Sequence, residues 1–247
     1  MTDKAADVTG SARGIGRGCA LELARRGYDI VIVDLLPAEM ARTAGEIAAL
    51  GRRVMTEEAD VSDHARAREI AAAVKARFGR IDVLVNNAGR GNPTGILDIT
   101  EEGFDRTIAV NLKSCFNYIQ AFVPLMLDGG GGRIVSMSSL NAHTGGVTSA
   151  VSKFSYAAAK AGIIGMTKAL AKELGPTIAI NCVCPGIIET EVGNSLTKAR
   201  GPELAKKIVL NRLGTPADVA QLVAFLACTE PFFITGQAFT IEPGTSL

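Results

Sequence analysis

Two residues suited to proton transfer stand four positions apart in the segment Tyr156-Ala-Ala-Ala-Lys160. If this segment is helical, the phenol and the ammonium share one face, because positions i and i+4 are neighbours on a helix. A nearby ammonium stabilises the phenolate form of a phenol. Tyr156 could then give a proton to a ketone during reduction and take one from an alcohol during oxidation. The spacing alone is weak support, since such pairs are also ordinary surface contacts.

A glycine-rich segment near the N-terminus, Thr9-Gly-Ser-Ala-Arg-Gly-Ile-Gly16, joins a predicted strand to a predicted helix. Glycines allow a tight turn and close approach of the backbone to a diphosphate, and the helix start offers unpaired N–H groups to it. The position between a first strand and a helix makes the motif more specific. We therefore predict a dinucleotide-binding loop that uses Gly10, Arg13, Gly14, Ile15 and Gly16.

Asp34 ends the second predicted strand. A carboxylate there can accept hydrogen bonds from the adenosine ribose and repel a 2′-phosphate, which favours NAD over NADP. Arg13 argues the other way, because a guanidinium in the loop could bind a 2′-phosphate. We predict NAD, with NADP as the less favoured cofactor. The simpler interpretation of Asp34 is a solvated residue at a strand end.

The third and fourth predicted strands also end in polar or small residues. Asp60 and Val61 follow the third strand, and Asp60 could meet the adenine amino group. The segment Asn86-Asn-Ala-Gly89 ends the fourth strand, and its Ala-Gly pair leaves room for a cofactor, although Asn and Gly also suit turns. In a parallel sheet these strand ends converge on one crevice. The predicted cofactor site therefore gains Asp60, Val61, Asn87, Ala88 and Gly89.

Apolar runs alternate with helical patterns along the whole chain. The predicted strands are Ala5–Thr9, Asp29–Asp34, Arg53–Glu57, Ile81–Asn86, Arg133–Ser138, Ile178–Val183 and Ala238–Ile241. The predicted helices are Gly14–Arg26, Ala38–Leu50, Asp63–Phe78, Glu102–Leu127, Ser155–Leu174 and Ala217–Ala227. This alternation implies right-handed crossovers and a parallel sheet, and continuously apolar strands indicate burial on both faces. We predict an α/β fold with one doubly wound (Rossmann) sheet, three layers, and a single domain over residues 1–247.

One residue of the first predicted strand does not fit a buried position. Asp7 stands where a central strand normally has an aliphatic side chain. We expect either that it lies near the end of the sheet or that its carboxylate has a local partner.

Taken together and in order, these motifs resemble the short-chain dehydrogenase/reductase family, in its single-domain branch of about this length. The resemblance runs from about Lys4 to Gly244. The features that carry it are the glycine-rich loop, Asp60, the Asn-Asn-Ala-Gly segment, Asn111, Ser139, Tyr156, Lys160 and Pro185-Gly186. Because several independent motifs agree, the resemblance is specific.

The resemblance implies roles at the matching positions. Ser139 would hydrogen-bond the substrate oxygen, Tyr156 would transfer the proton, and Lys160 would bind the nicotinamide ribose and stabilise the phenolate. Asn111, in a segment like the family's helix-kinking site, would hold a water that links Lys160 to solvent. A nicotinamide-binding segment would use Pro185, Gly186, Ile188 and Thr190, with the Ile188 backbone and the Thr190 hydroxyl meeting the carboxamide.

The chain departs from the family pattern between the serine and the tyrosine. Ser139 precedes Tyr156 by more residues than is usual, and Ser138 is the alternative catalytic serine. The extra residues fall within 144–155, which we expect to loop over the substrate mouth. Asn141 and His143 could line the pocket there, although a loop histidine without a role is an equal alternative for His143.

The substrate is less well defined by the sequence. Residues 193–210 are expected to form a mobile lid, and their polar side chains favour a sugar, polyol or hydroxy acid. A 3-oxoacyl-thioester (acyl-carrier-protein) reductase is the alternative, but Asp34 and the lack of Lys or Arg in Phe122–Leu127 argue against a carrier-protein substrate. A catalytically silent cofactor-binding protein is an alternative of another class, which the intact set of predicted catalytic residues disfavours.

Composition limits the partners. With 26 basic and 25 acidic residues, the chain has no charge excess that would favour nucleic acid or an anionic membrane. Two histidines are too few for most His-based metal sites, so we predict no metal. Five cysteines without a C-x-x-C pair, and no apolar signal or membrane-spanning run, favour a cytoplasmic protein. The resemblance implies a homotetramer, sometimes a dimer, and the candidate contact residues are Val123, Ile164, Met166 and Leu170.

Overall fold

The computed structural model describes residues 4–146, 152–191, 201–203, 205–206 and 208–244. Within them, one sheet of seven parallel strands has the order β3-β2-β1-β4-β5-β6-β7. The strands are β1 (Ala5–Thr9), β2 (Asp29–Asp34), β3 (Val54–Glu58), β4 (Val83–Asn86), β5 (Gly132–Met137), β6 (Ile178–Pro185) and β7 (Ala238–Ile241). The predicted fold class and all seven predicted strands are confirmed, with ends that shift by one or two residues.

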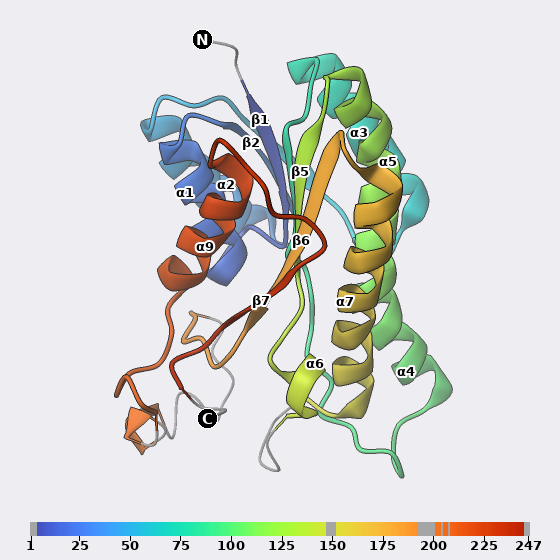
Figure 1. The fold of residues 1–247 in the computed structure, drawn as a ribbon, viewed down its shortest axis with the longest axis vertical. Helices are drawn as coiled ribbons and strands as arrows, with labels where there is room; N and C mark the ends of the chain where they lie inside the picture. Colours follow the sequence, from blue (N-terminus) through green and yellow to red (C-terminus); the bar gives the residue numbers. More distant parts are fainter. Residues whose placement is uncertain (1–3, 147–151, 192–200, 204, 207, 245–247) are drawn as a thin grey trace.

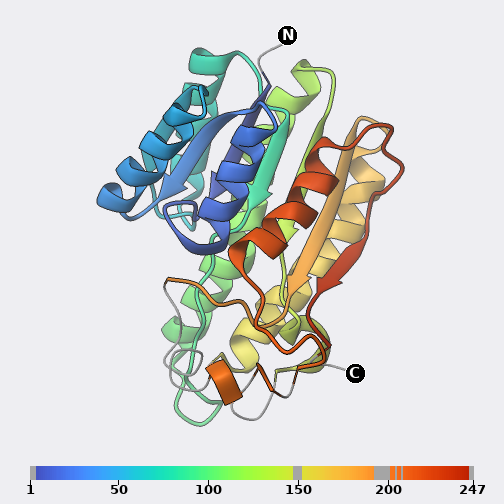
Figure 2. The same ribbon diagram turned by 90° about the vertical axis from the view of Figure 1, so that its left-hand side faces the viewer.

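Helices cover both faces of this sheet (Figures 1 and 2). One face carries α1 (Gly14–Arg25), α2 (Pro37–Ala49) and α9 (Pro216–Cys228). The other face carries α3 (His64–Phe78), α5 (Ser114–Asp128) and α7 (Phe154–Leu174). The three layers predicted from the sequence are therefore present.

The predicted helix Glu102–Leu127 is interrupted. It consists of α4 (Glu101–Ile108), a π-helical turn η1 (Ala109–Lys113) and α5. A short helix that the sequence analysis did not predict, α6 (Asn141–Thr144), packs against α7 (Figure 1). No helix among the described residues is both long and apolar enough to cross a bilayer.

The core lies in two layers, one on each side of the sheet. Ile30 and Ile32 of β2 pack with Leu23 of α1, whereas Val31 and Val33 pack into the opposite cluster with α3 and α5. Alternate residues of a strand point to opposite faces, so a strand covered on both sides must be apolar throughout. Each such buried side chain stabilises the fold by roughly 1.5–3 kcal/mol.

Asp7 does not behave as the sequence analysis expected. It lies in the middle of β1, the central strand, between Val31 of β2 and Leu84 of β4. It is completely buried, and among the described residues neither carboxylate oxygen has a hydrogen-bond partner. Both expectations, a place near the sheet end and a local partner, are therefore wrong. Burial, with a smaller contribution from the charge of Glu57, raises the pKa of Asp7 well above its usual value.

The strand order reverses between β1 and β4. From β1 the chain moves outward through β2 and β3, and then returns to add β4 to β7 on the other side. Two crossovers leave this point in opposite directions, which opens a crevice at the carboxyl ends of β1 and β4. The predicted site residues follow these strand ends.

Candidate active site

A cavity of about 1160 Å³ opens at the carboxyl edge of the sheet. It brings together most of the predicted site residues, namely Gly10, Arg13, Gly14, Ile15, Asp34, Asp60, Val61, Asn87, Ala88, Gly89, Asn111, Ser139, Asn141, Tyr156, Lys160, Pro185, Gly186, Ile188 and Thr190. Gly16 and His143 are not among its described lining residues. Residues as far apart in the chain as Gly10 and Thr190 thus share one space.

The glycine-rich loop is braced by Asn87. The Asn87 side-chain amide donates to the carbonyl oxygens of Thr9 and Gly10, at 2.9 and 3.0 Å. A side chain on Gly16 would overlap the Gly10 carbonyl and the Asn87 amide, so this position must remain glycine. Asn87 therefore fixes the loop through its side chain, which goes beyond the turn role that its residue type alone suggested.

The start of α1 suits a diphosphate. Its N-cap residue, Arg13, makes no side-chain hydrogen bond to the first turn. The N–H groups that open a helix have no partner within the helix, and they carry the positive end of its dipole. Since Gly14 and Ile15 line the cavity at this point, the loop fits the phosphates of a dinucleotide.

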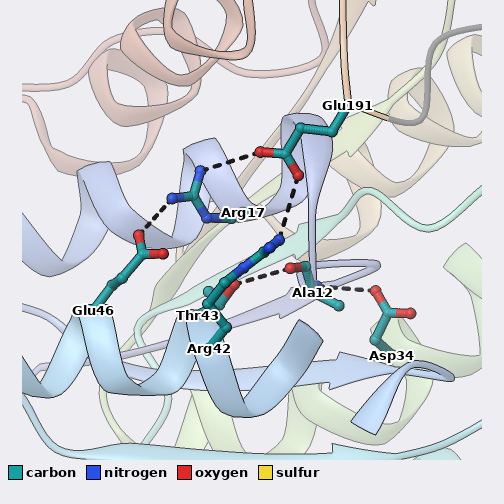
Figure 3. Close-up of polar contacts among 7 residues, drawn as sticks. All are labelled: Ala12, Arg17, Asp34, Arg42, Thr43, Glu46 and Glu191. Carbon is teal, nitrogen blue, oxygen red and sulfur yellow. Dashed lines mark hydrogen bonds and ion pairs between the residues drawn. The ribbon is translucent and has the colours of Figure 1, made fainter. Parts of the chain in front are cut away.

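Asp34 is positioned by two backbone N–H groups at the end of β2. Its Oδ2 accepts from the Ala12 N–H at 2.9 Å, and its Oδ1 accepts from the Leu35 N–H at 2.7 Å. Figure 3 shows the carboxylate directed at the loop segment that holds Ala12. The Ala12 carbonyl in turn accepts from Thr43 of α2 at 2.9 Å. A fixed negative charge therefore stands beside the phosphate loop, where the ribose of an adenosine would lie.

Two arginines on the helices that flank the phosphate loop, α1 and α2, are already paired. Glu191 lies between Arg17 and Arg42, with N–O distances of 3.7 and 3.5 Å, and Arg17 also pairs with Glu46 (Figure 3). The neighbouring Thr190 packs against the loop, because a Cβ on Gly14 would lie 3.7 Å from its methyl group. The segment after β6 is thus tied to α1 and α2 across the phosphate loop.

Asp60 makes contacts that the sequence did not reveal. Its Oδ1 accepts from the Ser62 N–H and hydroxyl, and its Oδ2 accepts from Arg106 at 2.7 Å. Partial burial favours the protonated form, but these hydrogen bonds outweigh it and the pKa of Asp60 lies below its usual value. Asp60 is therefore a charged wall residue of the cavity, with Arg106 as its partner.

Tyr156 and Lys160, the predicted proton-transfer pair, lie in the first two turns of α7. Lys160 is buried, and its ammonium donates to the Met137 carbonyl at the end of β5, at 2.7 Å. The same nitrogen lies 5.6 Å from the centre of the Tyr156 ring. Tyr156 is half-buried and lines the cavity. The predicted helical spacing is confirmed, and the bond to Met137 fixes the ammonium on the floor of the site.

The two candidate serines have different surroundings. Ser138 is buried and its hydroxyl donates to the Lys160 carbonyl at 2.7 Å. The Ser139 hydroxyl accepts from the Asn141 N–H at 3.2 Å, and its own proton has no acceptor among the described residues. Both line the cavity, but only Ser139 has a donor left to offer. This arrangement favours Ser139 as the residue that meets a substrate oxygen.

Asn111 lies in the π-helical turn and is completely buried. Its amide donates to the carbonyls of Thr107 and Arg90, and its side-chain oxygen accepts from the Arg90 N–H. Such turns often occur at functional sites because they re-aim side chains and backbone groups. A Cβ on Gly89 would lie 2.8 Å from the Asn111 oxygen and 3.2 Å from the Lys160 nitrogen. Asn111 and Lys160 therefore meet at Gly89.

His143 interacts with a cysteine on β6. The Cys184 thiol lies against the side chains of Cys182, His143 and Ser138. These hydrogen bonds, that from Cys182 foremost, lower the pKa of Cys184 against the opposing effect of burial. All five cysteines are free. Asn141 lines the cavity as predicted, while His143 faces this thiol.

Some lining residues were missed by the sequence analysis. They are Leu35, Leu36, Arg90, Gly91, Asn92, Pro93, Arg106, Thr107, Val110, Leu140, Ser152 and Ile187, among others. The segment Arg90–Pro93 directly follows the Asn-Asn-Ala-Gly motif, and that adjacency was a usable signal. Thr107 and Val110 reach the cavity only because the helix is interrupted, which no local pattern indicated. Most of the predicted lid, and residues 147–151 of the predicted mouth, lie outside the described residues.

Comparisons with known proteins agree with this geometry. A family model described as enoyl-(acyl carrier protein) reductase matches residues 10–246. The oxidoreductase UcpA of Salmonella typhimurium is 38% identical over 256 residues, which cover 100% of this chain and 96% of that protein. The 3-oxoacyl-[acyl-carrier-protein] reductase FabG of Thermotoga maritima is 38% identical over 238 residues, covering 96% and 95% of the two chains.

Solved structures show the same fold. A short-chain alcohol dehydrogenase, described as putative, from Sinorhizobium meliloti superposes with a TM-score of 0.91 at 31% identity, covering 99% of this chain and 97% of that one. An actinorhodin polyketide ketoreductase solved with NADPH superposes with a TM-score of 0.90 at 29% identity, covering 98% and 97%. The chain belongs to the short-chain dehydrogenase/reductase family of oxidoreductases.

Proposed function

We propose that this protein transfers a hydride between NAD(H) and a secondary alcohol or ketone, with Tyr156 as the general acid and base. The observation that carries the proposal is the common cavity. It is lined by the phosphate loop and Asp34 at one end and by Ser139, Tyr156 and Lys160 at the other. A dinucleotide bound along the strand ends would bring its reactive ring to the proton-transfer pair.

Each residue of the site would have a separate role in this reaction. Bound NAD(H) supplies the hydride donor or acceptor. Ser139 donates a hydrogen bond to the substrate oxygen and stabilises negative charge that develops there. Tyr156 gives or takes the proton at that oxygen, and the Lys160 ammonium, fixed by Met137, lies beside the Tyr156 ring. Asn111 holds the Arg90 backbone beside Lys160. We also propose that Asn111 binds a water that links Lys160 to solvent.

Support for NAD comes from charge. Asp34 holds a fixed carboxylate beside the loop, and a 2′-phosphate placed there would meet like charge. Arg17 and Arg42 pair with Glu46 and Glu191, and neither is among the described lining residues of the cavity. Arg13 remains without an ion pair among the described residues and is the cation that favours NADP.

A second candidate is a 3-oxoacyl-thioester reductase, because relatives named FabG match nearly the whole chain. Asp34 opposes it if that substrate is reduced with NADPH. We favour a polar small-molecule substrate. We also propose a homotetramer in a reducing compartment, the cytoplasm. Val123, Ile164, Met166 and Leu170 are half-buried within the monomer, so at most part of each side chain remains for a subunit contact.

The test is a panel of sugars, polyols, hydroxy acids and 3-oxoacyl thioesters, read by NADH and NADPH absorbance. We expect turnover of a small polar alcohol or ketone, with higher kcat/KM for NAD(H). Exclusive use of the acyl thioester with NADPH would establish the second candidate. Binding of cofactor without turnover of any compound would favour a silent binding protein.

A further inference from the structure

Arg90 is a cationic side chain in the cavity that the proposed chemistry does not use. It directly follows Gly89, is exposed to solvent, and lines the cavity together with Tyr156 and Ser139. Its guanidinium makes no hydrogen bond or ion pair within the part of the chain that the structure describes. An arginine that is free in a cavity can bind a ligand without first breaking an internal pair.

The backbone that carries Arg90 is fixed. Asn111 accepts from the Arg90 N–H at 3.0 Å and donates to the Arg90 carbonyl at 2.9 Å. Two residues on, the Asn92 amide donates to Thr107 at 2.8 Å, and the Asn92 carbonyl accepts from the Lys153 N–H at 2.8 Å. The segment is thus held from η1 and α4 on one side and from the start of α7 on the other. Such anchoring reduces the entropy lost when the side chain binds a ligand.

The charges of the cavity are arranged unevenly. Its described acidic lining residues are Asp34 and Asp60, which follow β2 and β3 at the end where adenosine would bind. Apart from Arg13 and Arg106, the remaining charged lining residues are Arg90 and Lys160, and both are positive. Arg90 directly follows Gly89, where an added Cβ would lie 3.2 Å from the Lys160 nitrogen. Lys160 already donates to Met137. Asp60 pairs with Arg106 and Asp34 accepts from the Ala12 and Leu35 N–H groups, so no carboxylate of the described lining pairs with Arg90.

We propose that Arg90 binds a carboxylate of the substrate, so that the enzyme acts on hydroxy acids or oxo acids in preference to neutral sugars and polyols. This inference rests on the proposed function, and it selects one of the substrate classes considered there. Arginine suits this role because its planar fork donates two parallel hydrogen bonds to a carboxylate. With the carboxylate on Arg90, the carbinol or carbonyl oxygen is left for Ser139 and Tyr156.

The test compares hydroxy acids of four to six carbons with their methyl esters, phosphorylated polyols and neutral polyols. We expect the acids to have the highest kcat/KM. In Arg90→Gln the KM for the acids should rise about 10- to 100-fold, whereas the KM for the neutral esters should rise much less. Arg90→Lys keeps the charge without the fork and should retain part of the preference. Arg77→Gln, an exposed arginine on α3, is the matched control and should leave every constant unchanged.

Several outcomes would overturn the proposal. A wild-type preference for neutral alcohols would do so, as would a preference for phosphorylated polyols, which would assign Arg90 to a phosphate. In Arg90→Gln, a rise in the KM for NAD that is the same with every substrate would assign Arg90 to the cofactor diphosphate.

Binding measured without turnover separates this inference from the proposed function. The corresponding oxo acids and their methyl esters are titrated into the NADH complex of Tyr156→Phe. Acid binding that is lost in Tyr156→Phe/Arg90→Gln supports the anion site even if no panel compound is turned over. The anion site is contradicted if the oxo acids and their methyl esters bind equally, or if neither binds.

Discussion

The Asn111 side chain and the Arg90 backbone hydrogen-bond to each other in both directions, at 3.0 and 2.9 Å. This exchange joins the π-helical turn to the segment that follows β4. Gly89 lies immediately before it, against both the Asn111 oxygen and the Lys160 nitrogen. The proposed proton-transfer residues of α7, the turn η1 and the end of β4 thus meet around one glycine.

Gly89→Ala should therefore impair catalysis. Its Cβ would lie 2.8 Å from the Asn111 oxygen and 3.2 Å from the Lys160 nitrogen, so one of them must move. Because small displacements of catalytic groups are costly, we expect kcat to fall about 10- to 100-fold. Gly95→Ala is the control, since a Cβ there meets nothing within 4 Å. Equal kcat values for both variants would contradict this account of the contact.

Substitution distinguishes the roles of Ser138 and Ser139. Ser139→Ala removes the free donor in the cavity and should lower kcat about 10²- to 10³-fold. Ser138→Ala removes a buried hydrogen bond to the Lys160 carbonyl, so it should mainly reduce the free energy of unfolding, by about 1–3 kcal/mol. Steady-state kinetics and urea unfolding measure the two effects. A larger loss of kcat in Ser138→Ala would reverse the assignment.

Asp34→Asn tests the basis of cofactor choice. The variant keeps an oxygen that can accept from the Ala12 N–H but loses the negative charge. We expect the ratio of kcat/KM for NAD to that for NADP to fall at least tenfold, because the like-charge repulsion of a 2′-phosphate is gone. Glu58→Gln, at the end of the adjacent strand β3 and outside the cavity lining, is the control. A wild-type preference for NADP would refute the role given to Asp34.

The contribution of Asp7 to the free energy of unfolding should be less favourable at neutral pH than in acid. Burial raises the pKa of Asp7, so the folded state holds this proton at pH values where the unfolded state has lost it. Stability from this group is complete below about pH 4, the ordinary aspartate value, and falls as pH rises towards the folded pKa. Asp7→Val should therefore unfold at a higher urea concentration than the wild type at pH 8. Its free energy of unfolding should be larger by about 1–3 kcal/mol at pH 8, with a smaller gain at pH 4.

Two further variants complete this test. Asp7→Asn should abolish the pH-dependent part of the difference while keeping a buried polar group. Asp98→Asn, at an exposed aspartate, should change stability little at either pH. A loss of stability in Asp7→Val at pH 8 would show that the carboxylate is favourably bound in the fold.

Local patterns predicted the sheet and most of the cavity because both follow from strand ends. Continuously apolar strands can only be buried on both faces, and parallel strands place their ends at one edge. The features that could not be predicted depend on contacts far apart in the chain. Arg106 meets Asp60 across two different crossovers, and the interruption around Asn111 appears as one continuous helical pattern in the sequence. The Asp7 environment was misjudged because its strand was known but its place in the strand order was not.

The most direct test of the central claim is Tyr156→Phe, assayed on the substrate found in the panel. Removal of one hydroxyl leaves the cavity wall and the bond from Lys160 to Met137 intact, so NADH binding, followed by fluorescence, should be unchanged. We predict that kcat falls about 10²- to 10⁴-fold, the usual contribution of a positioned acid or base. Turnover within a few-fold of wild type, with cofactor still bound, would contradict the assignment of Tyr156 as the proton-transfer residue.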